Sequence, residues 1–216
     1  MSLPRWGHPP AGPPQATVTG GDADLAAAVD RAPGSRLAFR PDEGSDLART
    51  LGLRAAARPD RVEVALDALR CGGDLDALAV NAVVVGVAPH RLRRTSRARL
   101  CTVVVDGRQR WCGPATTVVV ATGQFLAGAD VVPRGHPGDG RAEVQVYAVP
   151  GPERAELRRR LASGTHLPHP AIRTLSGVEI EVRSPSPRPV AVDGTPRGRA
   201  RDLRVRLVAG AYSLVL

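Results

Sequence analysis

Short runs rich in valine recur through the last two thirds of the chain, bounded by glycine or proline. Valine favours extended backbone, whereas glycine and proline favour turns, so the pattern predicts many short strands. One helical run, at residues 153–163 with Leu157 and Leu161 on one face, interrupts them. Closely spaced strands of this kind are typical of a β-sandwich. The predicted strands cover residues 79–87, 99–106, 116–122, 143–149, 178–183, 189–193, 203–208 and 211–216.

The first part of the chain has a different pattern. A β-prone run at residues 16–19 leads into Gly20-Gly21-Asp22-Ala23-Asp24 and then into an alanine-rich helical sequence. A strand, a glycine turn and a helix in this order form a unit that can hold phosphate on backbone N–H groups, although Gly-Gly-Asp also makes ordinary turns. Residues 36–39 predict a second strand, and residues 45–51 predict a short helix with Ser45 as its N-cap.

These patterns predict an α/β plus β architecture. We expect a flexible Pro/Gly-rich lead at residues 1–15, a partial α/β nucleotide-binding domain at residues 16–56 and a β-sandwich at residues 57–216. Within the last region, Asp60-Arg-Val-Glu63 fits a capping box and predicts a helix over residues 60–70.

Composition narrows the class of partner. The net charge is +9, and all 30 basic residues are arginine. These arginines are scattered and aromatic residues are scarce, which favours codon bias in a GC-rich genome over nucleic-acid binding as the explanation. A basic surface still favours a phosphate-bearing ligand or an anionic membrane surface. The patch Arg91, Arg93, Arg94, Arg97 and Arg99 can meet lipid head groups, although a solvated arginine-rich loop is the better default interpretation.

The expected location is the cytoplasm, with peripheral contact at a membrane as a further option. The lead has no apolar core of the signal-peptide kind, and no run approaches the roughly 18 apolar residues that a membrane span needs. Cys71, Cys101 and Cys112 are odd in number and lack metal spacing, so we expect reduced thiols.

Six segments occur in the order found in one enzyme family. The chain resembles the bacterial diacylglycerol kinase and sphingosine kinase-like lipid kinases from about residue 16 to its end. After the Gly20–Asp24 loop, the segments are Pro41–Arg49 at the place of a second phosphate loop, Thr122–Gly128, Pro133 with Gly138-Asp139-Gly140, Leu161–Pro170 and Val192-Asp193-Gly194.

The resemblance implies transfer of the γ-phosphoryl group of ATP to a lipid hydroxyl, assisted by Mg²⁺. It implies that the lipid enters a cleft between the two domains, where Asp193 and Thr195 occupy the catalytic turn. A structural metal would be held by Asp139 and by the backbone carbonyls of His136 and Arg141. The implied nucleotide-binding residues are Gly20, Gly21, Asp22, Asp24, Glu43, Gly44 and Asp46.

Several positions depart from the family pattern. Ala23 and Asp24 replace glycine and threonine in the first loop, and Asp42 and Glu43 replace glycine and threonine in the second. Carboxylates there repel phosphate unless a cation bridges them. Thr195 replaces the glutamate that accepts the proton, and threonine is no general base near neutral pH, although Asp193 can substitute.

The family has a β-α-β-α segment before the first loop, so we expect an N-terminally truncated domain whose sheet edge is covered by a second copy or a partner. Two hypotheses follow: a weak or inactive lipid kinase-like enzyme, and a non-catalytic module that binds a lipid or an anion. An NAD kinase-like protein, which shares the first loop, is a third alternative, and the Asp-Gly turns argue against it.

Overall fold

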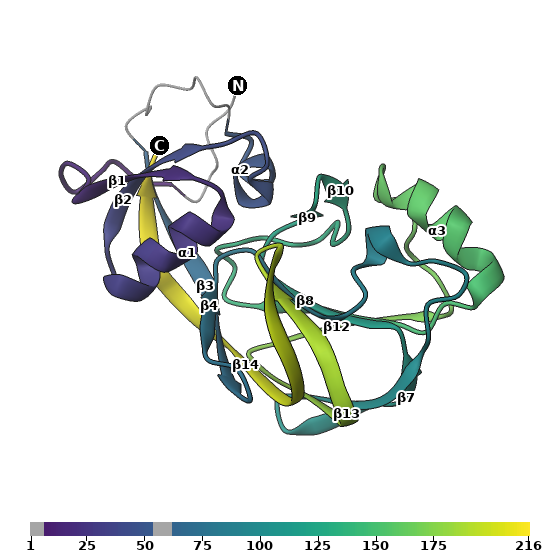
Figure 1. The fold of residues 1–216 in the computed structure, drawn as a ribbon. Coiled ribbons are helices and arrows are strands. Elements are labelled where there is room, and N and C mark those ends of the chain that lie inside the picture. Colours follow the sequence, from purple (N-terminus) through teal and green to yellow (C-terminus); the bar gives the residue numbers. More distant parts are fainter. Residues whose placement is uncertain (1–6, 54–61) are drawn as a thin grey trace.

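The computed structural model describes residues 7–53 and 62–216. Strands dominate it, and Figure 1 shows an α/β unit beside a larger β-rich unit. The helices are α1 (Asp22–Arg31), α2 (Asp46–Thr50), α3 (Arg154–Leu161) and the 3₁₀ turns η1 (Pro89–Arg91) and η2 (Gly151–Glu153). The strands are β1 (Ala16–Gly20), β2 (Arg36–Pro41), β3 (Glu63–Gly73), β4 (Ala77–Ala79), β5 (Ala82–Gly86), β6 (Arg99–Val105), β7 (Arg108–Ala115), β8 (Thr117–Ala121), β9 (Phe125–Leu126), β10 (Ala129–Asp130), β11 (Ala142–Tyr147), β12 (Ile172–Gly177), β13 (Glu179–Val192) and β14 (Thr195–Val215).

One 12-stranded sheet runs through the molecule in the order β1-β2-β14-β13-β5-β8-β11-β12. β3 pairs with β14 and β4, and β6 pairs with β13 and β7, while β9 and β10 form a separate hairpin. The β1–β2 and β2–β14 pairs are parallel, and β1 and β2 are joined through α1 as expected for a parallel pair. The β-rich unit is built from antiparallel pairs. The expected α/β plus β class is therefore confirmed.

The long strand β14 belongs to both units. Its first part pairs with β13, and its end, Ser213–Val215, pairs in parallel with β2. The register against β3 shifts between Val208 and Tyr212, where Gly210 has a positive φ of 58° and its N–H donates to the Asp67 carboxylate. This bulge redirects the strand, so the α/β unit is assembled from distant parts of the sequence.

The helix predicted over residues 60–70 is wrong for the part that is described, because the chain there is β3; residues 60 and 61 lie outside the described residues. The first half of β3 directs Val64, Leu66 and Ala68 into the α/β core. The second half directs Leu69 and Cys71 from the opposite face into the sandwich core. Burial on alternate faces at period two therefore overrides the local capping signal.

Most other predicted elements are present. Ser45 caps α2, with its hydroxyl accepting from the Ala48 N–H at 3.0 Å. The predicted strands 178–183 and 189–193 are one strand, β13, and 203–208 and 211–216 are both parts of β14. Sequence reasoning missed β7 and β12, which have fewer apolar residues, and the short β9–β10 hairpin.

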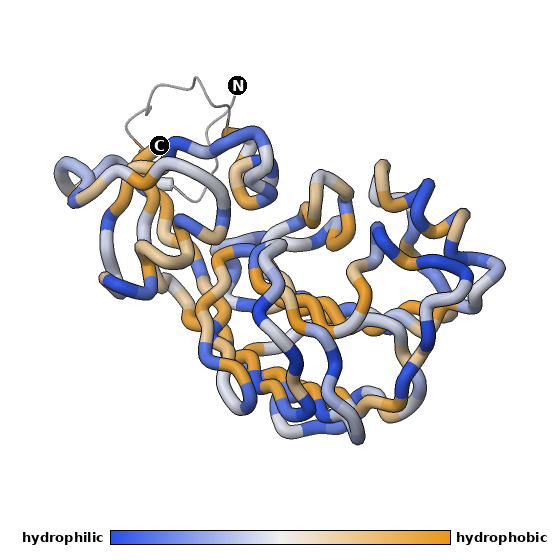
Figure 2. The backbone as a smooth tube through the Cα atoms, viewed as in Figure 1, coloured by the Kyte–Doolittle hydropathy of each residue, from blue (hydrophilic) through white to orange (hydrophobic). Residues whose placement is uncertain are grey.

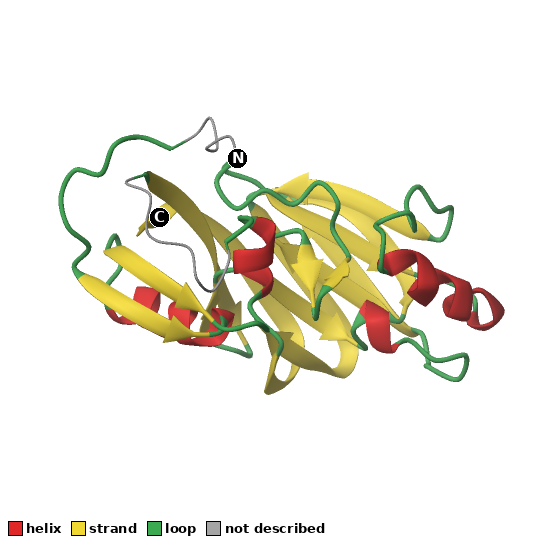
Figure 3. Cartoon of the chain, turned by 90° about the horizontal axis from the view of Figure 1, so that it is seen from above, coloured by secondary structure: helices red, strands yellow, loops and turns green. Residues whose placement is uncertain are grey.

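Figure 2 shows hydrophobic residues along the strands of both units and hydrophilic residues on α3 and the loop beside it. Seen from above, α2 lies between the β1–β2 pair and the sandwich, and α3 lies at the far end (Figure 3). The part of the lead at residues 8–15 bonds to β2 and β3, through Gln15 N–H to Arg36 O and through a bridge from His8 to Glu63. No helix in the described ranges is long and apolar enough to cross a membrane.

Candidate functional site

A cleft of about 370 Å³ lies where the α/β unit meets the sandwich. It brings together both predicted phosphate loops and the predicted catalytic turn, which are up to about 170 residues apart in the sequence. The α/β side contributes Gly21, Asp22, Ala23, Asp24, Asp42, Gly44 and Asp46. The sandwich side contributes Val84, Ala88, His90, Arg91, Leu126, Ala127, Ala191, Asp193, Gly194, Thr195 and Pro196.

The first loop is closed by its own carboxylate. β1 ends at Gly20, whose φ of 127° favours glycine, and Gly21 is the N-cap of α1. Asp24 Oδ2 accepts the Gly21 N–H at 2.9 Å, and a Cβ added to Gly20 would lie 2.2 Å from that oxygen. The loop therefore has the predicted strand–glycine–helix geometry. One of its backbone N–H groups, that of Gly21, already donates to the Asp24 carboxylate.

Asp22 connects the two loops. Its side chain is buried, accepting the Ser45 hydroxyl at 2.5 Å and the N–H groups of Asp46 and Leu47 at 3.2 and 3.1 Å. Burial raises the pKa of this carboxyl to about 6, against the lowering effect of these hydrogen bonds. Asp22 thus caps the start of α2 and fixes the second loop relative to the first.

The second loop presents Asp42, not Glu43, to the cleft. Asp42 Oδ1 accepts the Gly44 N–H at 3.0 Å, in a local turn that aspartate commonly makes. Glu43 is exposed and does not line the cleft, and Gly20 does not line it either. A phosphate in the cleft would therefore meet Asp24 and Asp42, two carboxylates that each already accept a loop amide.

Asp46 fastens the α/β unit to the sandwich. It begins α2, is buried, and accepts the N–H groups of Ala127 and Gly128 at 2.5 and 2.8 Å. Both residues have positive φ in the turn between β9 and β10. These bonds join the two walls of the cleft, and Asp46 also lines it. Its role as a nucleotide-binding residue stays a prediction.

The turn between β13 and β14 carries Asp193. Asp193 and Gly194 have φ values of 46° and 74°, and Val192 pairs with Thr195, as in a two-residue Asp-Gly hairpin. Asp193 Oδ1 accepts the N–H groups of Asn81 and Ala82, and Oδ2 accepts that of Val80. Oδ2 therefore keeps one acceptor position open.

Burial raises the pKa of Asp193 to about 7, and the nearby charge of Asp22 adds to the rise against the effect of the amide hydrogen bonds. A carboxyl that titrates near neutral pH can accept and release a proton efficiently at pH 7. Thr195 lines the same cleft and brings no ionisable group. Asp193 is therefore the residue of this turn that is suited to acid–base work.

His90 and Arg91 were missed as cleft residues. They lie in η1, directly after the buried strand β5, and face the acidic loops across the cleft. Burial, with the charge of Arg91, lowers the pKa of His90. The only signal in the sequence is Pro89-His90-Arg91 shortly after a valine-rich strand, and a run of arginines there also fits a solvated loop or a lipid surface.

The acidic residues of the cleft do not form a ready-made magnesium site. The described ranges contain no group of three or more His, Cys, Asp or Glu side chains able to hold a metal ion. Asp22 accepts the Ser45 hydroxyl and two backbone N–H groups, and Asp46 accepts two backbone N–H groups. Asp24 and Asp42 each accept one backbone N–H group. The carboxylates of this cleft therefore do not fit a bound Mg²⁺ as they stand.

The predicted structural metal turn lies outside the cleft. Asp139 Oδ1 accepts the Arg141 N–H at 3.0 Å, and His136 Nδ1 accepts the Gly138 N–H at 3.3 Å. Asp67, which sequence reasoning missed, holds the same turn by accepting the Gly140 N–H at 2.8 Å. A site of one carboxylate and two carbonyls at Asp139, His136 and Arg141 stays a prediction.

Comparisons with known proteins agree with this arrangement. Residues 90–215 match a protein-family model described as the YegS C-terminal NAD kinase beta sandwich-like domain. A diacylglycerol kinase structure from Bacillus anthracis str. Sterne is similar in fold, with a TM-score of 0.75 and 18% identity over 92% of this chain and 75% of that one.

Two nucleotide kinases are more distant in fold. An NAD kinase from Archaeoglobus fulgidus in complex with ATP gives a TM-score of 0.54 at 13% identity, over 93% of this chain and 76% of that one. Yeast NADH kinase complexed with NADH gives a TM-score of 0.54 at 13% identity, over 92% of this chain and 61% of that one. No curated protein sequence matches the chain.

Proposed function

Because the chain belongs to the family defined by the YegS C-terminal NAD kinase beta sandwich-like domain, we propose that it is a lipid kinase-like protein with very slow or no phosphoryl transfer. Its ligands would be ATP and a lipid of the diacylglycerol or sphingoid type. The fold shared with a diacylglycerol kinase from Bacillus anthracis supports the lipid hydroxyl as acceptor. The fold shared with an ATP-bound NAD kinase from Archaeoglobus fulgidus supports a nucleotide in the cleft.

The weakness of the proposed activity rests on one observation. In each glycine loop a carboxylate of the chain accepts a backbone amide, Asp24 from Gly21 and Asp42 from Gly44. Phosphoryl transfer depends almost wholly on positioning the phosphates and neutralising their charge. A γ-phosphate in this cleft meets negative charge where the family supplies neutral donors, so nucleotide binding is weak and its position is poor.

Any residual transfer would use Asp193 as the base. The lipid hydroxyl oxygen would form a bond to the γ-phosphorus, and the bond from phosphorus to the β–γ bridging oxygen would break with release of ADP. The hydroxyl proton would pass to Asp193 Oδ2, the oxygen with an open acceptor position. The raised pKa of Asp193 supports this role.

A second candidate is a binding module without catalysis. Thr195 favours it, because the turn lacks the second ionisable group that the family places there. Under this alternative the cleft would still accept a ligand, and no phosphorylated lipid would form.

The test is transfer of labelled phosphate from ATP to diacylglycerol or a sphingoid base in mixed micelles with magnesium. We expect turnover that is absent or barely above background, and thermal stabilisation only at high micromolar ATP or above. Robust turnover in the unmodified chain would contradict the proposal. Slow turnover that disappears in Asp193→Asn, with the fold intact by circular dichroism, would favour the residual enzyme over the binding module.

A further inference from the structure

The short β9–β10 hairpin is held from two sides, and Figure 1 and Figure 3 both show it between α2 and α3. On the α2 side, Asp46 accepts two N–H groups of the hairpin turn, and Thr50 Oγ1 accepts the Gln124 N–H at 3.0 Å. On the other side lies the segment at residues 163–169, which directly follows α3 and is called the post-α3 segment below. The hairpin therefore connects this segment to the wall of the cleft.

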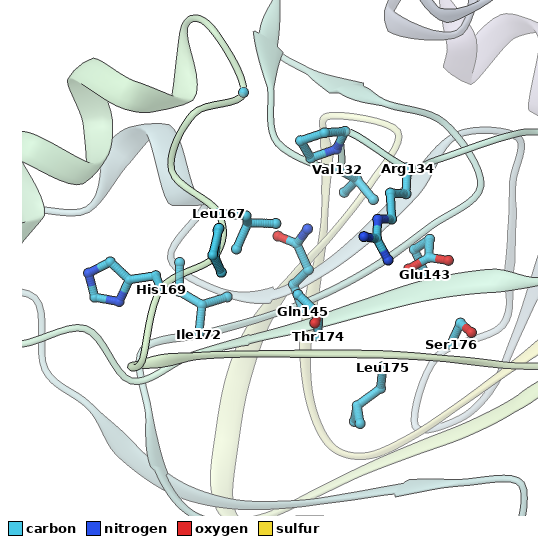
Figure 4. Close-up of a pocket in the computed structure, with 13 residues that line it drawn as sticks. Val132, Arg134, Glu143, Gln145, Leu167, His169, Ile172, Thr174, Leu175 and Ser176 are labelled. Atoms are coloured by element: carbon cyan, nitrogen blue, oxygen red, sulfur yellow. The ribbon is translucent and has the colours of Figure 1, made fainter.

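The post-α3 segment has little backbone support of its own. Within the described ranges, the N–H groups of His166 and Leu167 donate to no protein acceptor. Leu167 and His169 stand at one side of a cavity of about 640 Å³, as Figure 4 shows. Segments with few backbone hydrogen bonds open at low cost in free energy, so side-chain contacts must keep this segment in place.

His166 makes the contact at which buried polar atoms lack partners. The residue is 1% exposed, and within residues 7–53 and 62–216 neither ring nitrogen makes a hydrogen bond. Asp130 of β10 lies beside it, with Oδ1 buried and equally unpartnered, while Oδ2 accepts the Gln124 amide at 2.9 Å. A Cβ added to Gly164 would lie 2.5 Å from Asp130 Oδ2, so the segment and β10 touch. Unpartnered buried polar atoms are rare and costly, which makes this contact sensitive to any change of charge.

The charges around His166 determine how it responds to a proton. Asp130 acts on it from β10 and His169 from its own segment, and His169 in turn lies 3.3 Å from the Glu153 carboxylate of η2. Burial lowers the pKa of His166, the Val131 backbone and Asp130 act in the opposite direction, and His169 adds to the lowering. An exposed ring therefore binds a proton more tightly than the buried ring, so a fall in pH favours the exposed position.

From this geometry we propose that the contact between His166 and Asp130 is a pH-sensitive switch, in which protonation of His166 releases the post-α3 segment from the β9–β10 hairpin. The proton gives the ring a charge and a second donor, and the buried position provides a hydrogen-bonded acceptor for neither. Release moves one side of the cavity and frees one side of the hairpin, while the bonds from the hairpin to α2 remain. The switch does not depend on the proposed kinase activity.

The test is hydrogen exchange of the full chain at pH 7 and pH 5, measured by mass spectrometry and corrected for the intrinsic rates. Peptides over residues 125–132 and 163–169 should exchange at least about fivefold faster at pH 5, because the released ring binds the proton more tightly. His166→Gln, which cannot titrate, should abolish this increase. His169→Gln is the matched control and should keep it, since a protonated His169 would hold Glu153 more strongly and oppose release.

Asp130→Asn separates a switch from a merely structural contact. Removing the charge that favours a proton on the buried ring should enlarge the increase at pH 5, whereas loss of a structural contact would speed exchange equally at both pH values. Exchange of both peptides that is unchanged between pH 7 and pH 5 would overturn the proposal. So would an increase that persists in a folded His166→Gln protein.

A direct titration covers the case in which His166→Gln does not fold. The ring signal of His166, followed by NMR in the unmodified chain, should titrate with a midpoint below 6.5, the ordinary value for histidine. A midpoint at or above that value would refute the switch, because the buried ring would then hold the proton as tightly as the exposed one. None of these measurements involves ATP, so their failure leaves the proposed kinase-like function standing.

Discussion

The two walls of the cleft use the same interaction, a carboxylate that accepts backbone amides, over different sequence distances. On the α/β wall, Asp24 and Asp42 bond amides three and two residues away, and both side chains are exposed. On the sandwich wall, Asp193 bonds amides 111 to 113 residues away, in the β4–β5 connection and at the start of β5. Replacing Asp24 or Asp42 should therefore cost little stability, whereas Asp193 supports the fold.

The largest effect on the rate of phosphate transfer is expected at Thr195, which stands where the family has a glutamate that accepts the proton. Thr195→Glu should raise phosphate transfer to diacylglycerol about 100-fold, since general base catalysis contributes roughly 10²- to 10⁴-fold. Initial rates in mixed micelles measure the change. Thr195→Gln, equal in size and neutral, should not reproduce it, and an inactive but folded Thr195→Glu protein would refute the kinase-like assignment of this wall.

Asp193→Asn should destabilise the protein by about 3 kcal/mol, because an amide offers one acceptor oxygen where three N–H groups now bond a carboxylate. Asparagine tolerates the positive φ at this position, so the turn itself adds little strain. Urea unfolding at pH 8 measures the loss. Asp24→Asn should lower the free energy of unfolding by less than 1 kcal/mol. Equal losses of stability in the two variants would contradict the difference between the two walls.

Asp22 makes the first wall sensitive to pH. Its pKa is about 6 in the folded protein and near 3.8 when exposed. The folded state therefore binds the extra proton between pH 4 and 6, and the free energy of unfolding should fall by about 2 kcal/mol from this group as the pH rises through that window. The difference between wild type and Asp22→Asn, from urea unfolding, isolates the contribution, since the histidines are common to both. A constant difference across pH 4 to 6 would contradict it.

The smallest effect concerns nucleotide affinity. Replacing both exposed carboxylates, Asp24→Asn with Asp42→Asn, should tighten ATP binding about tenfold, because solvent screens most of the roughly 4 kcal/mol repulsion between close charges. Glu43→Gln is the matched control, since Glu43 is exposed and outside the lining. Calorimetry without magnesium gives the affinities. Similar affinity in all three proteins would show that the loop carboxylates do not limit binding.

Local sequence decided the elements whose signals are local. Valine runs between glycines gave period-two strands, Ser45 capped α2, and Asp193-Gly194 made a two-residue turn, because each depends on neighbouring residues. The order of the glycine loops and Asp-Gly turns along the chain was also sufficient to identify the family. These features needed no knowledge of what packs against them.

Tertiary structure decided the rest. β3 is a strand because two cores bury its opposite faces, and neither core is visible in residues 60–70. Asp46 was predicted only as a nucleotide-binding residue, and its hydrogen bonds to the Ala127 and Gly128 N–H groups depend on a turn 81 and 82 residues away. The sequence determined which carboxylates are present, but the atoms they bond lie up to 113 residues away, so only the fold could decide which of them remain free for a ligand.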